Sequence, residues 1–185
     1  MMNETELEEH LPELDLIEDP DLRAGVREAW QSAIEETEIE SLETVPWFPP
    51  VQRELDLPNE TLLSHVRDVT ACAVALADTL SERRGARIDM DTLVAGSLVH
   101  DVSKLYEFDG TDATPVGTLL GHPYYGVHVV ARAGLSVEIA HIVISHTRRT
   151  NVEPATIEAE IVRRADEAAA AAIRTEAVSD LRDAV

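Results

Sequence analysis

The stretch Leu98-Val99-His100-Asp101-Val102-Ser103-Lys104 joins an apolar run to a histidine, a carboxylate and an ammonium group. Neighbouring residues of a helix point about 100° apart, so His100 and Asp101 meet one ion only if it lies beside the end of their helix. Lys104 follows Asp101 by three positions and therefore shares its face. Taken alone, this stretch fits either a metal site or a solvated helix end with a chance cluster of charges.

The rest of the chain has the periodicity of helices, with no competing alternation of the kind that strands show. Residues 109–121 are rich in Gly, Thr, Asp and Pro and indicate a loop, and three prolines break the chain within residues 46–50. The sequence therefore predicts an all-α protein. The expected helices cover residues 21–43, Asn59 as N-cap to about Arg84 with Gly85 as the stop, Asp89 or Asp91 to His100, Pro123 to near Gly134, Ser136 to about His146, and Pro154 onward.

The region before the prolines differs from the rest. Residues 1–20 are acidic with little periodicity, which indicates a mobile or loosely docked arm. We therefore divide the chain into an acidic arm with an N-terminal helical extension, residues 1–50, and a domain of residues 51–185. The second part is long enough to bury a core of its own.

The composition is strongly acidic, with a formal net charge of -21. Fourteen of the fifteen basic residues are arginine, and Lys104 is the one lysine. An acidic, lysine-poor surface is similar to that of proteins from salt-loving cells, where salt screens the self-repulsion. Such a surface repels duplex nucleic acid, although a local basic pocket can still bind a small phosphate ester.

Composition also bounds the compartment. No apolar run approaches the roughly 20 residues that a membrane-spanning helix needs, and the N-terminus lacks the apolar segment of a signal peptide. Cys72 is the single cysteine, which excludes intramolecular disulfides and cysteine-based metal sites. We therefore expect a cytoplasmic protein without a membrane partner.

His65 and Asp166 lie on the apolar stripes of two other expected helices. Asp166 follows a valine by four positions and precedes an alanine by three, so it points where those residues point. A buried carboxylate is costly without a cation or a hydrogen-bond partner. A lone buried histidine is more often structural than a ligand. Two such residues on separate helices, with His100-Asp101 on a third, favour an ion shared within a helical bundle.

The order of these motifs resembles the HD-domain superfamily of metal-dependent phosphohydrolases. Residues 98–104 are similar to the His-Asp-x-x-Lys signature, and Gly121-His122-Pro123 resembles the His-Pro that opens a later helix. Ile142-Val143-Ile144-Ser145-His146 resembles a helix that ends in a further histidine, and Arg164-Ala165-Asp166 resembles the closing Ala-Asp. The resemblance spans about residues 60–172, and the composition suggests a halophilic archaeal-type member.

The resemblance implies an HD-domain bundle in which four residues hold one divalent metal: His65, His100, Asp101 and Asp166. Some members have two additional histidines that hold a second metal. In this chain His122 and His146 would take that role, and Asp101 would bridge the two metals. Such ligands suit Mn, Fe, Co, Ni or Zn, and Mg less well. Local hydrogen bonds at a helix start, or an imidazolium at a helix end, are the alternatives for the second pair. The remaining histidines are expected outside the site: His10, His128 and His141.

The implied activity is hydrolysis of a phosphate ester or anhydride in a small substrate such as a nucleotide. Asp101 would position the attacking water and assist its deprotonation, and Lys104 would neutralise developing charge. Further phosphate contacts are expected from Lys104, Arg148 and Arg149, although ordinary surface ion pairs are the alternative. Two other functions stay open: a dinuclear-iron oxygenase of the HD type, and a non-catalytic regulatory module that binds metal or nucleotide. The sequence also leaves open whether one or two ions bind and whether the chain forms a homo-oligomer.

Overall fold

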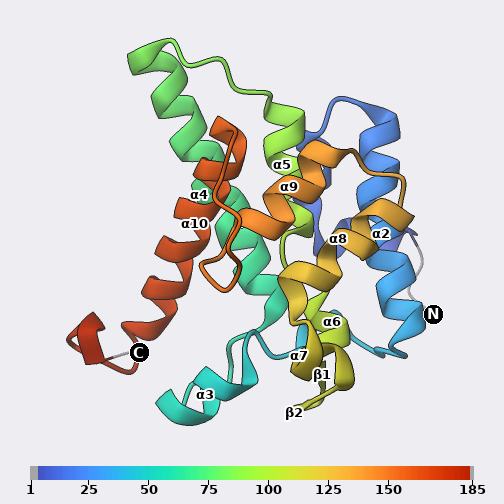
Figure 1. Ribbon diagram of the computed structural model, residues 1–185, viewed down its shortest axis with the longest axis vertical. Helices are drawn as coiled ribbons and strands as arrows, with labels where there is room; N and C mark the ends of the chain where they lie inside the picture. The colour runs from blue at the N-terminus through green and yellow to red at the C-terminus, as the bar shows by residue number, and fades with distance from the viewer. Residues whose placement is uncertain (1–3, 184–185) are drawn as a thin grey trace.

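Two long helices, α4 (Leu62–Arg84) and α10 (Ile157–Arg174), lie side by side in the computed structural model, which describes residues 4–183 (Figure 1). Helix α5 (Met90–Val99) packs against both and against α9 (Val137–Ser145), which in turn packs against α8 (His122–Arg132). Helix α2 (Pro20–Glu36) contacts α5 and α8. The predicted all-α fold is therefore confirmed.

Helix α5 positions the site because it has no polar face. Its residues from Leu93 to Val99 are all buried, as expected of a helix that is apolar on every side. Consequently His100 and Asp101, which follow its last turn, also lie inside the molecule. The alternative of a solvated helix end is excluded by this burial.

The segment that follows contains more structure than the predicted loop. Helix α6 (Lys104–Glu107) leads into an antiparallel pair of very short strands, β1 (Phe108–Asp109) and β2 (Asp112–Ala113), with Phe108 opposite Ala113. Helix α7 (Pro115–Leu119) then begins with its proline in the first turn. Gly110, with a φ of 58°, makes the tight reversal between the strands.

Several expected helix ends were displaced by a few residues. Helix α2 ends at Glu36 rather than near residue 43, because Glu38 adopts a left-handed φ of 55° and the N–H of Ile39 bonds to the carbonyl of Ile34. The apolar spacing continues past this point and concealed the stop. Thr61, not Asn59, caps α4, since its side chain accepts the N–H of Ser64.

Other caps follow the same local chemistry. Helix α10 starts after Thr156 rather than at Pro154, because the Thr156 hydroxyl accepts the N–H of Ala159. Ser136 and Gly85 play their predicted roles at the start of α9 and the end of α4. Asp89 caps α5. Pro49 and Pro50 break the chain as predicted but also open a short helix, α3 (Pro49–Leu55).

The expectation of a loosely docked arm was wrong for its described residues. Helix α1 (Glu4–His10) and the 3-10 turn η1 (Pro12–Leu16) of this arm belong to the packed structure, and residues 1–3 lie outside the described range. A second 3-10 turn, η2 (Leu42–Thr44), lies after the arm, between α2 and α3. Four apolar side chains spaced three or four positions apart are buried in the main core: Leu7, Leu11, Leu14 and Ile17. Acidic residues between them hid this stripe. Within residues 4–183 no helix is long and apolar enough to cross a membrane.

Candidate metal centre

Helices α4, α5, α8, α9 and α10 bring together all six residues expected to bind metal. His65 lies in the first turn of α4 and Asp166 in the middle of α10. His122 is the first residue of α8, and His146 directly follows α9. Their ligand atoms form two groups, each with atoms within 4.8 Å of one another. The first group is His65, His100 and Asp166, and the second is Asp101, His122 and His146.

Asp101 lies between the two groups and faces both. Its Oδ2 atom is 3.4 Å from Nε2 of His100 and 3.6 Å from Nε2 of His65. Its Oδ1 atom is 3.3 Å from Nε2 of His122 and 3.6 Å from Nε2 of His146. Each carboxylate oxygen therefore faces its own pair of histidines, which is the arrangement that a bridging carboxylate needs.

The backbone orients two of the imidazole rings. Nδ1 of His100 lies 2.6 Å from the carbonyl oxygen of Ser97, and Nδ1 of His146 lies 2.6 Å from that of Val143. Because a carbonyl can only accept, Nδ1 carries the hydrogen in both rings and Nε2 keeps its lone pair. Both lone pairs then point toward the centre, as in most histidines that bind metal.

His122 is oriented by a side chain instead. Its Nδ1 atom is 2.8 Å from Oε2 of Glu107, a buried residue at the end of α6. Burial alone would raise the pKa of Glu107, but the hydrogen bond from His122 and nearby cations lower it, so the carboxylate stays ionised. The hydroxyl of Ser103 donates to the carbonyl of His122 and holds the start of α8 against α6. Gly126 permits this approach, because a Cβ there would lie 3.0 Å from Oγ of Ser103, and it also lets α8 lie close to Val143 of α9.

The centre fits a divalent cation. Nε2 of His100 and Oδ1 of Asp101 are buried and have no hydrogen-bond partner. Leaving such atoms without a partner is costly, and a cation between the two groups would satisfy both. Nitrogen and oxygen donors of this kind suit transition metals.

Charge states at neutral pH match those of metal ligands for most of the set. Burial, followed by the charge of His100, lowers the pKa of His146 to about 3, and burial lowers that of His65, so both stay neutral. Burial would raise the pKa of Asp166, but the hydrogen bond from His65 and the charges of His100 and His146 together outweigh it and bring the pKa to about 2. The pKa of His100 is raised instead, because the carboxylates of Asp101 and Asp166 together outweigh burial.

Lys104 contacts the same carboxylate. Its Nζ atom lies 2.6 Å from Oδ2 of Asp101, and the side chain is 8% exposed. Burial would raise the pKa of Asp101, but Lys104, His100 and His122 together hold it well below its usual range. The structure thus brings Lys104 to the centre, as an ion-pair partner of the shared carboxylate.

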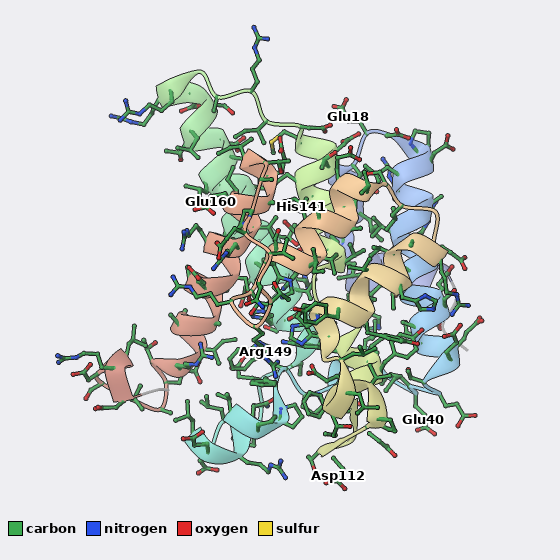
Figure 2. All side chains as sticks on the ribbon, in the orientation of Figure 1. Glu18, Glu40, Asp112, His141, Arg149 and Glu160 are labelled. Carbon is green, nitrogen blue, oxygen red and sulfur yellow. The ribbon has the colours of Figure 1, made fainter. Side chains whose placement is uncertain are left out.

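A cavity of about 100 Å³ opens at the centre. Arg149, labelled in Figure 2, lines this cavity. Its guanidinium lies 5.2 Å from the ring centroid of Phe48 and 3.6 Å from Oε1 of Glu107. Arg148 does not line this cavity: its exposed guanidinium pairs with Glu167. The structure therefore brings one of the two expected arginines to the site.

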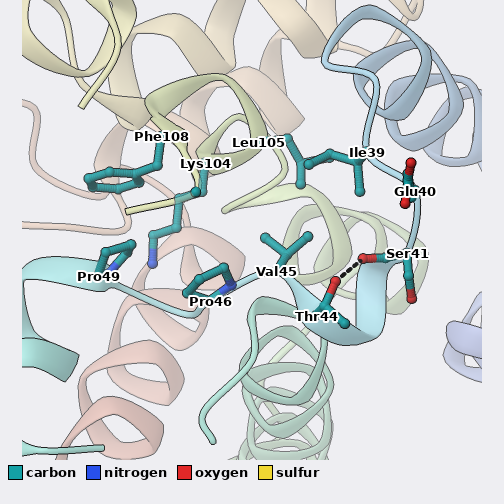
Figure 3. A pocket seen from close by; sticks show the side chains of 11 residues that line it. Ile39, Glu40, Ser41, Thr44, Val45, Pro46, Pro49, Lys104, Leu105 and Phe108 are labelled. Carbon is teal, nitrogen blue, oxygen red and sulfur yellow. Dashed lines mark hydrogen bonds between the residues drawn. The ribbon is translucent and has the colours of Figure 1, made fainter. Parts of the chain in front are cut away.

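A second cavity of about 190 Å³ adjoins the stem of Lys104 but contains none of the six expected ligands. It is lined mainly by apolar side chains of the segment before α3 and of residues 105–108. Figure 3 shows the Lys104 side chain running past Phe108 toward Pro46 and Pro49. Lys104 is thus shared by the two cavities.

Residue-based reasoning missed four side chains of the site: Glu107, Trp47, Phe48 and Arg174. Glu107 follows Lys104 by three positions on the same face, a signal that was present in the sequence. Trp47 and Phe48 were interpreted only as part of a chain break, although aromatic residues are just 4% of the chain and two of them are adjacent here.

The three other histidines lie outside both groups of ligands. Nε2 of His141 accepts the N–H of Ala155, which ties α9 to the segment before α10 (Figure 2). The ring of His128 packs against that of Tyr125. His10 is the last residue of α1.

Comparisons with known proteins agree with this arrangement. The family model described as the HD domain matches residues 62–171. The dihydroneopterin 2',3'-cyclic phosphate phosphodiesterase of Methanocaldococcus jannaschii is 35% identical over 112 residues, which cover 58% of this chain and 45% of that relative. The chain therefore spans less than half the length of the relative. No solved structure matches.

Proposed function

The chain belongs to the HD-domain family, and we propose that it is a metal-dependent phosphohydrolase that cleaves a phosphate ester or anhydride of a small molecule. The observation that carries this proposal is the position of Asp101. Its two carboxylate oxygens face separate pairs of histidines, and Lys104 contacts one of these oxygens, Oδ2. A site of this kind that hydrolyses a phosphate ester needs ligands for a metal and a fixed positive charge beside them. Here the candidate ligands and the ammonium group of Lys104 all face the carboxylate of Asp101.

We propose a phosphodiester, and first a cyclic one, as the substrate. The relative is named for a cyclic phosphate of a pterin, and a nucleotide offers the same combination of a ring system and a phosphoryl group. The cavity at the centre is lined by Lys104 and Arg149, whose cationic groups suit a phosphoryl group. Duplex nucleic acid is not expected to bind a chain with a net charge of -21.

The residues divide the work by position. We propose two divalent ions, one held by His65, His100, Asp101 and Asp166 and one by Asp101, His122 and His146. A bound metal would supply a nucleophilic water near neutral pH and would draw charge from the phosphoryl oxygens. Asp101 positions the attacking water, since its two oxygens face both groups of ligands. Lys104 neutralises charge that develops on the phosphoryl group, and Arg149 helps to hold the substrate.

We further propose that residues 51–185 form the HD domain and residues 1–50 an extension that covers it, in a protein of a high-salt cytoplasm. Formation of a homo-oligomer by this protein stays a prediction. The hydrolytic relative and the cations around the cavity support the hydrolase over a dinuclear-iron oxygenase or a non-catalytic module.

The test is a substrate panel for protein purified in molar KCl and loaded in turn with Mn²⁺, Fe²⁺, Co²⁺, Ni²⁺, Zn²⁺ and Mg²⁺. The panel contains phosphomonoesters, linear and 2',3'-cyclic phosphodiesters, and nucleoside triphosphates. The wild type is expected to hydrolyse one class of substrate. The control Asp112→Asn, which changes an exposed carboxylate, should do the same, whereas Asp101→Asn should lose both the metal and the activity. Metal-replete protein that hydrolyses none of them would overturn the proposal, and oxygen consumption by the iron form would favour the oxygenase.

A further inference from the structure

Three cationic side chains line the cavity at the metal centre: Lys104, Arg149 and Arg174. Two of them are paired with carboxylates, Lys104 with Asp101 and Arg149 with Glu107. Arg174, at the end of α10, forms no ion pair within the described residues, and its Nε atom is buried without a hydrogen-bond partner. It is thus the cation of this cavity whose charge is not already matched.

This lack of a partner is unusual for such an acidic chain. Thirty-six acidic residues accompany fifteen basic ones, so an arginine meets a carboxylate easily. Other arginines without an ion pair, such as Arg53 and Arg87, are exposed, where water satisfies the guanidinium. Arg174 is half-buried and lines a cavity instead. A half-buried guanidinium with a free edge is suited to an anionic ligand that enters from solvent.

The guanidinium of Arg174 contacts an aromatic ring rather than a carboxylate. Its guanidinium lies 5.4 Å from the ring centroid of Trp47, while Arg149 lies 5.2 Å from that of Phe48. Two adjacent aromatic residues therefore support two arginines at the same cavity. Stacking on a ring restricts a guanidinium while leaving its N–H groups free to donate.

We propose that Arg174 is a substrate-binding residue, whose N–H groups donate to a non-bridging oxygen of the phosphate, and that Trp47 is the residue that positions it. This inference rests on the proposed function for the identity of the substrate. Trp47, Phe48 and Arg174 all lie outside residues 62–171, the part of the chain that the family model matches. The proposal also assigns a role to the segment before α3, which covers the centre and supplies the aromatic support.

The test measures equilibrium binding of inorganic phosphate to metal-loaded protein by isothermal titration calorimetry in one fixed high-salt buffer. Wild type is compared with Arg174→Gln and Arg174→Lys at matched metal content, and Arg53→Gln is the control because Arg53 is also unpaired but exposed on α3. The dissociation constant is expected to rise about tenfold in Arg174→Gln, the loss of one charge-assisted contact. Arg174→Lys should recover part of it, since an ammonium restores charge but not the two-pronged geometry.

Tryptophan fluorescence gives a second readout. Trp47 contacts the guanidinium, whereas Trp30 is fully buried with its Nε1 donating to Leu98, so phosphate should change the emission of Trp47 alone. The change is expected to disappear in Trp47→Phe and to shrink in Arg174→Gln. If Arg174 had only a structural role, Arg174→Gln would lower the melting temperature without altering phosphate binding.

Phosphate affinity within twofold of wild type in folded Arg174→Gln, or no phosphate binding by the wild type, would overturn the inference. Its failure is distinguishable from that of the proposed function. If phosphate binding depends on Arg174 but the protein hydrolyses no ester, the anion site is supported and the proposed hydrolase activity is contradicted. If the protein hydrolyses an ester and its KM is unchanged in Arg174→Gln, the hydrolase activity is supported and the role of Arg174 is contradicted.

Discussion

The ammonium group of Lys104 lies 2.6 Å from Oδ2 of Asp101, the oxygen that also faces His65 and His100. One carboxylate oxygen thus serves a fixed cation and half of a metal site. The ion pair holds Asp101 ionised inside the protein. It also places a positive charge at the mouth of the cavity where a phosphoryl group would bind.

Removing the charge of Lys104 is expected to lower turnover and to spare the metal, because an ammonium cannot bind a cation. Lys104→Met keeps the stem that lines the second cavity, and Lys104→Ala removes it. Both should reduce kcat by about 10²-fold, the low end for one oriented donor, with Lys104→Arg rescuing part of it. Steady-state kinetics at matched metal content is the measurement. Unchanged kinetics would make Lys104 a structural ion-pair partner, and lost metal would mean that it supports the ligands.

Glu107→Gln is expected to weaken one half of the metal centre. Glu107 orients His122, and removing a carboxylate partner of this kind costs about 10- to 100-fold in metal affinity. His65, His100 and Asp166 do not contact Glu107, so elemental analysis should show a fall toward one ion per chain. The exposed change Asp112→Asn is the control. Full occupancy of both halves in Glu107→Gln would show that the glutamate does not support a ligand.

The metal-free protein is expected to lose stability in acid through His146. Its pKa is about 3 in the folded chain, against about 6.5 in the unfolded one, so the unfolded chain binds more protons between these values. The free energy of unfolding should therefore fall as pH falls from about 6.5 toward 3. Asp166 adds to the loss at lower pH, since its folded pKa of about 2 lies below the unfolded value. The raised pKa of His100 acts in the opposite direction.

Denaturant titrations in high salt across this pH range are the measurement. His146→Asn removes the titrating ring, so its free energy of unfolding should depend less steeply on pH than that of wild type. Equal slopes for the two proteins would contradict the depressed pKa.

Salt is expected to stabilise the fold. The net charge of -21 creates self-repulsion that ions screen, so the melting temperature should rise from dilute buffer to molar KCl. Magnesium-free buffers separate this screening from binding at the metal centre. A melting temperature that does not change with KCl would contradict the halophilic interpretation.

Local spacing was sufficient for the helical class, and it singled out His65, His100-Asp101 and Asp166 as candidate ligands. The candidates His122 and His146 came from the resemblance to the HD-domain superfamily. Period, caps and breakers act over a few residues, so the sequence reports them directly. His65 and Asp166 were recognisable because polar residues on apolar stripes need a shared partner. The order of the motifs then connected them with His100-Asp101, His122 and His146, and the structure brings all six together.

The tertiary structure decided what distant segments do to one another. Which oxygen of Asp101 faces which histidines depends on how five helices pack, and no local pattern encodes it. The burial of Leu7 and Leu11 depends likewise on a core built by later residues. Arg174 meets Trp47 only because α10 ends beside the segment that precedes α3. Spacing along a chain describes one helix at a time, whereas a site shared by several helices is set by the packing that brings their faces together.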